Sequence, residues 1–213
     1  MGNKRFIAIA GNIGSGKTTL TELLANRYQW DPHYEAVTNN PYLSDFYGDM
    51  NRWSLQLQVF FLSKRFQAHQ AILSGTSSAI QDRSIYEDAH IFARALHEEG
   101  KMDTRDYENY LELYQTMTPF LTPPDLVVYV RRSVPCLKQR IAQRGRDYEA
   151  NIPEQYLFHL NDCYDDWIKN YRIGKVLSVD ADDLDLKSSP RDFEYVCNKM
   201  ETSLEQPEFF FTC

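Results

Sequence analysis

Short apolar runs alternate with longer segments of helical periodicity along most of the chain. The apolar runs predict strands at 6–10, 33–37, 78–81, 126–130 and 176–179. The segments between them predict helices at 17–28, 52–74, 85–99, 104–118, 135–144, 153–172 and 191–203. This alternation is typical of an α/β protein with a parallel sheet. We therefore expect a five-stranded parallel sheet with helices on both faces.

The chain has the size and composition of one folded domain. It has 213 residues, of which 43% are hydrophobic and 25% are charged, as in a globular protein with a substantial core. No internal repeat or linker divides it, so we expect one domain over residues 1–213. Its formal net charge of −7 argues against a nucleic-acid polymer as partner, because such partners favour a basic surface.

The cysteines and the apolar segments indicate a compartment. No CxxC pair occurs, which excludes the usual zinc spacings and favours reduced thiols in the cytoplasm; the cysteines are Cys136, Cys163, Cys197 and Cys213. The first apolar run is too short for a signal peptide, and no stretch approaches the roughly 20 apolar residues that cross a bilayer. We expect a cytoplasmic protein without a membrane partner. The apolar tail is expected to pack on the body or on a second subunit; it consists of Phe209, Phe210 and Phe211.

One segment matches every position of the phosphate-binding loop G-x-x-x-x-G-K-[ST]. It follows the predicted strand 6–10 and precedes the predicted helix 17–28, and its residues are Gly11, Asn12, Ile13, Gly14, Ser15, Gly16, Lys17 and Thr18. Backbone N–H groups and the helix N-terminus bind phosphate oxygens in such a loop. Lys17 would reach the β- and γ-phosphates, and the Thr18 hydroxyl would bind Mg²⁺. The loop indicates use of ATP or GTP and leaves the second substrate open.

Acidic residues lie near the carboxyl ends of two other predicted strands. Glu35 lies near the end of strand 33–37, where a carboxylate would accept the proton of an attacking hydroxyl, although such a residue is also often a solvated surface charge. Asp82 and Arg83 follow strand 78–81. We expect Asp82 to bind Mg²⁺ and Arg83 to neutralise charge on the transferring phosphoryl group. The alternative for this pair is a helix N-cap with a local ion pair.

A basic segment interrupts the acidic chain between residues 131 and 146. It has six cations and no acid, namely Arg131, Arg132, Lys138, Arg140, Arg144 and Arg146. Such a segment suits a small polyanion such as a triphosphate; the alternative is a solvated helix face. Ser133 is a candidate N-cap of the helix that carries it, and Gly145 would end that helix.

With these motifs placed, the chain resembles the deoxynucleoside kinases, the family of deoxycytidine, deoxyguanosine and bacterial deoxyadenosine kinases. The resemblance covers nearly the whole chain and includes, in order, the segments GNIGSGKTT, YEAV, FYGDMNRWSLQLQ, DRSIYEDAHIF and RGRDYEANIPEQY. It implies a P-loop kinase fold with an arginine-rich lid at about 144–152. It also implies a homodimer that uses ATP and Mg²⁺ and binds a deoxynucleoside.

The resemblance implies further site residues. The ATP loop extends to Thr19, and the lid arginines that cover the triphosphate are Arg140, Arg144 and Arg146. Glu35 resembles the general base for the 5′-hydroxyl, with Ala36 in place of the family's usual proline. Asp82 stands where the family usually has glutamate.

A second group of residues resembles the family's nucleoside site. Tyr47 and Glu149 resemble the pair that holds the sugar 3′-hydroxyl. Four further residues resemble those that bind the base in the family: Gln58, Arg65, Asp88 and Phe92. Gln58 lies in an apolar run, where an amide without a partner would cost about 1–3 kcal/mol; a backbone hydrogen bond is the alternative to a base.

These features together predict transfer of the γ-phosphate of ATP to the 5′-hydroxyl of a deoxynucleoside. An ionised Asp88 accepts hydrogen bonds only, so we expect adenine, guanine or cytosine to be accepted better than thymine, and we favour deoxyadenosine. A nucleoside monophosphate kinase of the thymidylate kinase type is one alternative. A non-catalytic nucleotide-binding subunit is another.

Overall fold

The computed structural model describes residues 4–35, 40–149 and 152–206. Its centre is a five-stranded sheet in the order β2-β3-β1-β4-β5, in which neighbouring strands run parallel. This confirms the sheet expected from the sequence. The strands are β1 (Phe6–Ala10), β2 (Asp31–His33), β3 (Ala79–Asp82), β4 (Leu126–Arg131) and β5 (Lys175–Asp180).

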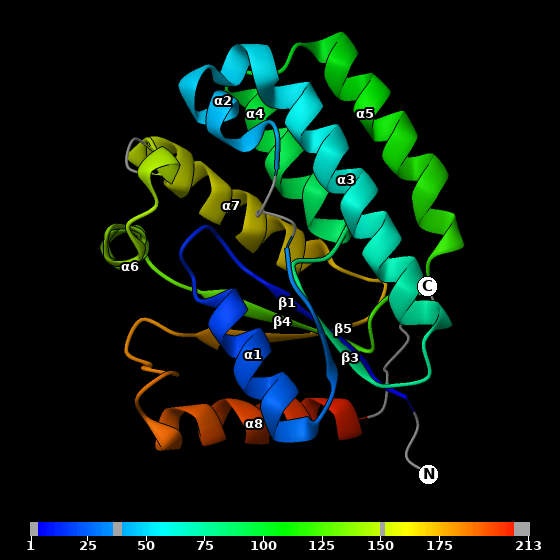
Figure 1. Ribbon diagram of the computed structural model, residues 1–213, viewed down its shortest axis with the longest axis vertical. Helices are drawn as coiled ribbons and strands as arrows, with labels where there is room; N and C mark the ends of the chain where they lie inside the picture. The colour runs from blue at the N-terminus through cyan, green and yellow to red at the C-terminus, as the bar shows by residue number, and fades with distance from the viewer. Residues whose placement is uncertain (1–3, 36–39, 150–151, 207–213) are drawn as a thin grey trace.

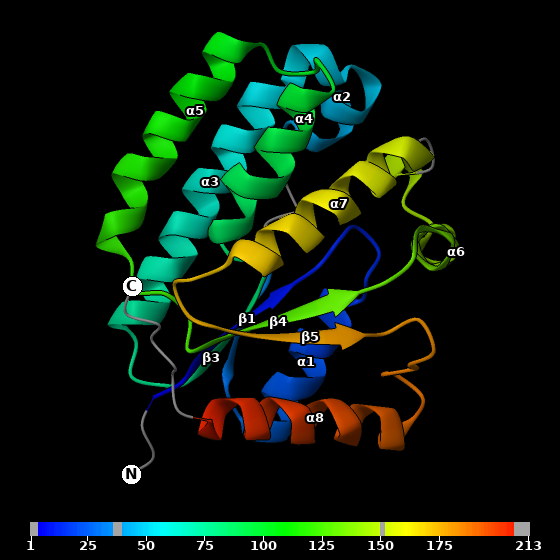
Figure 2. The ribbon, with the colours of Figure 1, turned by 180° about the vertical axis from the view of Figure 1, so that it is seen from behind.

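Helices cover both faces of the sheet (Figure 1). Helices α1 and α8 lie on one face, while α2, α3, α4, α5 and α7 gather on the other, an arrangement that is also visible from behind (Figure 2). The helices are α1 (Lys17–Tyr28), α2 (Leu43–Gly48), α3 (Met50–Ser74), α4 (Arg94–Glu98), α5 (Thr104–Met117), α6 (Val134–Arg144), α7 (Glu154–Asn170) and α8 (Pro190–Glu205). Further helical turns are η1 (Asp88–Ala93), η2 (Thr118–Phe120) and η3 (Asp147–Glu149).

The apolar run of β1 is continuous because the strand is buried on both faces. Successive side chains point to opposite faces of a strand. Ile7 and Ile9 therefore pack in the core beneath α1 and α8, whereas Ala8 and Ala10 pack in the larger core beneath the other helices. The small alanines leave room for the site-bearing helices on that face.

The structure corrects the predicted edge strand. Strand β2 runs from Asp31 to His33 and, within the described residues, pairs with β3, where Gln81 lies opposite His33. The strand ends at this pair, one residue before β3 ends at Asp82, so Tyr34 and Glu35 lie beyond it and not within the predicted 33–37. Glu35 therefore leaves the sheet at the carboxyl ends of the strands, where ligands bind in α/β folds.

The helical predictions hold with local differences. Helix α2 was not predicted, and the predicted helix 85–99 contains the π-helical turn η1 before α4. Ser133 and Gly145 flank α6 as expected, with Gly145 in the left-handed region at φ 66°. No described helix combines the length and apolarity that a bilayer-spanning segment needs. The predictions for 36–37, for lid positions 150–151 and for the tail 207–213 lie outside the described residues.

Candidate active site

The phosphate loop joins β1 to the first turn of α1. Gly11 and Gly14 have φ values of 152° and 83°, conformations that side chains rarely adopt. A Cβ atom at Gly11 would lie 2.7 Å from the carbonyl oxygen of Val130, and one at Gly14 would lie 2.8 Å from Ile141. Both glycines are thus required by the backbone path and by the close approach of β4 and α6.

Lys17 lies at the centre of this loop. Its Nζ donates to the carbonyl oxygen of Asn12 at 2.9 Å. Burial and the nearby Arg83 lower the pKa of Lys17 to about 8, so the ammonium remains mainly protonated at neutral pH. The side-chain amide of Asn12 donates to the carbonyl oxygen of Leu157 and to Asn161, both on α7.

Thr18 and Asp82 come together on the far side of the loop. The Thr18 hydroxyl donates to Asp82 Oδ2 at 2.5 Å, and Asp82 Oδ1 is buried without a partner among the described residues. Burial raises the pKa of Asp82. A hydroxyl beside a carboxylate with a free oxygen is a donor set that Mg²⁺ accepts. The two residues therefore fit a magnesium ion.

Glu35 lies between two arginines. Arg83 Nε is 3.0 Å from Glu35 Oε1, and Arg65 donates to the same oxygen. Burial opposes ionisation of this carboxyl, but Arg83, Arg65 and Lys17 outweigh it and hold its pKa at about 2. Glu35 is therefore a carboxylate at neutral pH, held at the junction of the phosphate loop and the cavity beside it.

One cavity of about 380 Å³ extends from the phosphate loop into the helices above the sheet. Its lining combines loop residues with most of the residues predicted to bind a nucleoside: Lys17, Thr18, Glu35, Tyr47, Gln58, Arg65, Asp82, Arg83, Phe92, Arg144, Arg146 and Glu149. The fold thus brings together side chains that lie more than 100 positions apart in the sequence.

The inner end of the cavity carries polar groups without partners. Gln58 is buried in α3, and its Oε1 accepts no hydrogen bond from any described residue. Asp88 is not one of the lining residues; its Oδ1 accepts from Arg65, which does line the cavity, and its Oδ2 has no partner within the same part of the chain. Burial raises the pKa of Asp88 to about 6 in spite of Arg65. The guanidinium of Arg83 lies 4.1 Å above the ring of Phe92.

The outer end of the cavity carries the residues expected to bind the sugar. Tyr47 stacks on Tyr148 with ring centroids 5.9 Å apart. Burial raises the pKa of Tyr47, and the nearby Glu149 adds to this effect, so its hydroxyl stays protonated. The carboxylate of Glu149 binds the lid arginines Arg144 and Arg146 at 2.5 and 3.3 Å.

Three cations of the basic segment are bound by other parts of the protein, and three line a cavity. Arg131 pairs with Asp165 and Lys138 with Glu154, so acids from α7 neutralise these two cations. Arg132 is buried and donates to the Ser15 carbonyl oxygen at 2.9 Å. The other three line a second cavity over the phosphate loop, together with the loop residue Thr19; they are Arg140, Arg144 and Arg146.

A profile of the family described as deoxynucleoside kinase matches residues 7–205. The chain belongs to the deoxynucleoside kinase family. It is 36% identical to the deoxyadenosine/deoxycytidine kinase of Bacillus subtilis (strain 168) over 196 residues, which are 91% of this chain and 90% of that protein. It is 39% identical to the deoxyadenosine kinase of Dictyostelium discoideum over 164 residues, 77% of this chain and 66% of that one.

Solved structures agree with this membership. The deoxyadenosine kinase of M. mycoides with bound dATP superposes with a TM-score of 0.82 at 28% identity, covering 92% of this chain and 99% of that one. The same kinase with dCMP and a flexible dCDP gives a TM-score of 0.80 at 29% identity, with coverages of 92% and 98%. The sequence resemblance is therefore confirmed, and the protein is an ATP-dependent phosphotransferase of deoxynucleosides.

Two features of this deoxynucleoside kinase were not found from the sequence. Lys187 also lines the cavity over the phosphate loop; it is the one cation in the acidic stretch ADDLDLKSSP, a signal that was available. The contact of Arg132 with the carbonyl oxygen of Ser15 could not be recognised from the sequence, because nothing distinguishes Arg132 there from the other cations of the basic segment.

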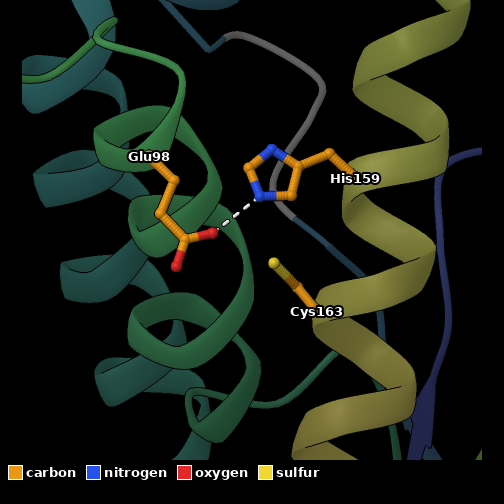
Figure 3. A group of neighbouring side chains, drawn as sticks. All are labelled: Glu98, His159 and Cys163. Carbon is orange, nitrogen blue, oxygen red and sulfur yellow. Dashed lines mark hydrogen bonds and ion pairs between the residues drawn. The ribbon is translucent and has the colours of Figure 1, made fainter.

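A cluster of Glu98, His159 and Cys163 joins α4 to α7 away from the cavity (Figure 3). His159 Nε2 lies 2.7 Å from Glu98 and Nδ1 lies 3.1 Å from Glu99. Both ring nitrogens face acceptors, so the ring must carry two protons, and hydrogen bonds to the two carboxylates outweigh burial and raise its pKa. Burial raises the pKa of the Cys163 thiol to about 11. A protonated ring and a protonated thiol offer no metal ligands, so we interpret the cluster as an ion pair between helices.

Proposed function

We propose that this kinase transfers the γ-phosphate of ATP to the 5′-hydroxyl of a purine or cytosine deoxynucleoside and prefers deoxyadenosine. One observation carries the proposal: a single cavity contains the phosphate loop at one end and buried, unpartnered polar groups at the other. Glu35 lies between them. This order suits a triphosphate donor at the phosphate loop and an uncharged acceptor at the polar end, with Glu35 between the two.

The residues suit phosphoryl transfer to an alcohol. Glu35, kept ionised by its arginines, accepts the hydrogen bond of the 5′-hydroxyl and takes its proton during in-line attack. Lys17, Arg83 and the lid arginines offset the charge that spreads over the transferring group. Mg²⁺ supplies further neutralisation when bound, and Thr18 and Asp82 are the residues that would hold it.

The inner end of the cavity supports the base preference. Gln58 lines the cavity with its amide oxygen, and Asp88, which accepts from the lining residue Arg65, has a second carboxylate oxygen; neither oxygen has a partner in the described chain. Both accept hydrogen bonds, which the amino groups of adenine and cytosine donate and the O4 carbonyl of thymine does not. The relatives named above as deoxyadenosine and deoxyadenosine/deoxycytidine kinases agree with this preference.

We further propose a cytoplasmic homodimer. Three of the four cysteines lie in the described residues, and all three are free thiols, as in a reducing compartment. Apolar side chains exposed on α3, α5 and η2 favour a second subunit, since they otherwise face water; they are Val59, Leu113 and Phe120. Light scattering coupled to size-exclusion chromatography measures the assembly, and a monomer would contradict it.

The assignment is tested by transfer from γ-labelled ATP to a panel of acceptors. The panel contains the four deoxynucleosides and their 5′-monophosphates, with and without Mg²⁺. We expect label on deoxyadenosine first, on deoxyguanosine and deoxycytidine next, and little on thymidine. Label on the monophosphates alone would assign a monophosphate kinase, and label on no acceptor would assign a non-catalytic subunit.

A further inference from the structure

Glu87 is a fully buried carboxyl that the mechanism above does not use. It lies in the turn before η1 and has no exposed surface. No cation lies within ion-pairing distance of it in the residues that the structure describes. A buried charge without a partner is costly, so such a carboxyl is either neutral or compensated by hydrogen bonds.

The two oxygens of Glu87 connect two backbone segments of the active site. Oε1 accepts from the backbone N–H of Ser84 at 2.8 Å and from the Ser84 hydroxyl at 3.3 Å. Oε2 lies 2.8 Å from the Tyr164 hydroxyl and accepts a longer bond from the Gly11 N–H at 3.4 Å. Ser84 directly follows Arg83, and Gly11 is the first residue of the phosphate loop.

A count of protons decides the charge of this group. The Tyr164 oxygen lies 2.7 Å from the carbonyl oxygen of Gly11 and 2.8 Å from Glu87 Oε2. The hydroxyl has one proton, and the carbonyl has none. If Tyr164 donates to Glu87, the Tyr164 oxygen and the Gly11 carbonyl oxygen lie 2.7 Å apart with no proton between them. If Tyr164 donates to Gly11, the proton between Tyr164 and Glu87 must belong to Glu87.

We propose that Glu87 is a neutral carboxylic acid that donates to Tyr164, which in turn donates to the Gly11 carbonyl. This relay makes Glu87 a positioning residue that fixes the phosphate loop relative to Arg83. Arg83 requires such support because its backbone is in the left-handed region at φ 69°, which a non-glycine residue rarely occupies. Burial also raises the pKa of Glu87, which agrees with the neutral form.

Titratable and charged groups surround Glu87 on every element packed against it. They are Lys17 of α1, Arg83 after β3, Asp88 of η1, Tyr129 of β4, Tyr164 of α7 and Tyr171 directly after α7. Arg83 and Lys17 favour the anion, whereas Asp88 disfavours it. The neutral form therefore depends on the relay and on burial, and it is lost as the pH rises through the pKa of Glu87.

The test compares Glu87→Gln with Glu87→Ala, and it rests on the phosphoryl transfer of the proposed function. A glutamine keeps the relay, because its amide donates to Tyr164 and its oxygen accepts from Ser84. We expect E87Q to keep kcat and KM for ATP within about twofold of the wild type, and E87A to lose about ten- to hundredfold in kcat/KM. The pH–activity profile of the wild type should fall at high pH as Glu87 ionises, and the profile of E87Q should lack this fall.

An infrared difference spectrum gives a readout that does not depend on activity. The full-length wild type at neutral pH should show the carbonyl band of a protonated carboxylic acid, and E87Q should lack this band. Labelling the glutamate carboxyl groups with ¹³C should shift the band. Absence of the band, or an E87Q enzyme as impaired as E87A, would overturn the neutral relay. Should the kinase activity itself fail on every acceptor, the infrared result still decides the state of Glu87.

Discussion

Arg83 Nε lies 3.0 Å from Glu35 Oε1, so the carboxylate proposed as general base is held by the cation proposed to neutralise the transferred phosphoryl group. Arg83 adopts its left-handed backbone at a cost of about 1–3 kcal/mol. The backbone N–H of Arg83 donates to Ile9 of β1 at 3.0 Å, which holds the turn against the central strand. The acid and the cation are thus oriented together before substrate binds.

Glu35→Gln should lower kcat by about 10²–10⁴-fold, because it removes the proton acceptor. ATP binding should change little, since Lys17 and the glycine loop remain. Steady-state kinetics and a separate fluorescence titration with an ATP analogue measure the two effects. Glu112→Gln, on an exposed position of α5, is the matched control. A Glu35→Gln enzyme with normal turnover would exclude Glu35 as the base.

Asp88→Asn should weaken the discrimination against thymidine. The asparagine amide donates to a carbonyl oxygen that the carboxylate repels, so the ratio of kcat/KM for deoxyadenosine over thymidine should fall by about tenfold or more. The ratio is measured in one reaction with both nucleosides present. If thymidine is already the best substrate of the wild type, our account of base selection is wrong.

Thr18→Val should raise the Mg²⁺ concentration required for half-maximal activity, because it removes a ligand and the hydrogen bond to Asp82. We expect a shift of about tenfold or more, by analogy with the loss of one charge-assisted contact. Magnesium titrations at saturating ATP measure it. Thr116→Val, on the exposed face of α5, should leave the titration unchanged; an equal response in both variants would contradict the role of Thr18.

Tyr47→Phe should reduce discrimination between 2′-deoxynucleosides and 2′,3′-dideoxynucleosides. The variant loses only the hydroxyl, and its ring can still stack on Tyr148. One neutral hydrogen bond corresponds to about tenfold in kcat/KM. The two acceptors are compared with each enzyme. Unaltered discrimination would place the 3′-hydroxyl elsewhere.

His159 should titrate above its ordinary pKa of 6.5, because Glu98 and Glu99 stabilise the protonated ring. A raised pKa in the folded state means that the ion pair stabilises the protein fully below pH 6.5. This contribution is lost as the pH rises through the folded pKa. NMR of the ring protons gives that pKa, and thermal unfolding of His159→Gln should lack the corresponding pH dependence. A titration midpoint at or below 6.5 would contradict the ion pair.

The local motifs were readable from the sequence because they are set by short-range requirements. The phosphate loop requires glycines where φ is positive and a lysine at the first turn of a helix, so a single segment identifies it. Strands β1 and β4 appear as continuous apolar runs because both of their faces are buried. Helix α6 was predicted within one residue, since a serine begins it and a left-handed glycine ends it.

The tertiary structure decided what depends on partners distant in the chain. The position of Glu35 follows from the end of β2, whose last pair joins His33 to Gln81 of β3, and no local pattern records that pairing. The six cations of 131–146 look equivalent in sequence, yet α7 neutralises two of them and the loop carbonyl of Ser15 binds a third. Likewise, the proton on Glu87 is set by Tyr164, 77 positions away, because only folding brings one hydroxyl between two oxygens. The charge and the geometry of a buried group depend on the residues around it, and tertiary packing determines which residues those are.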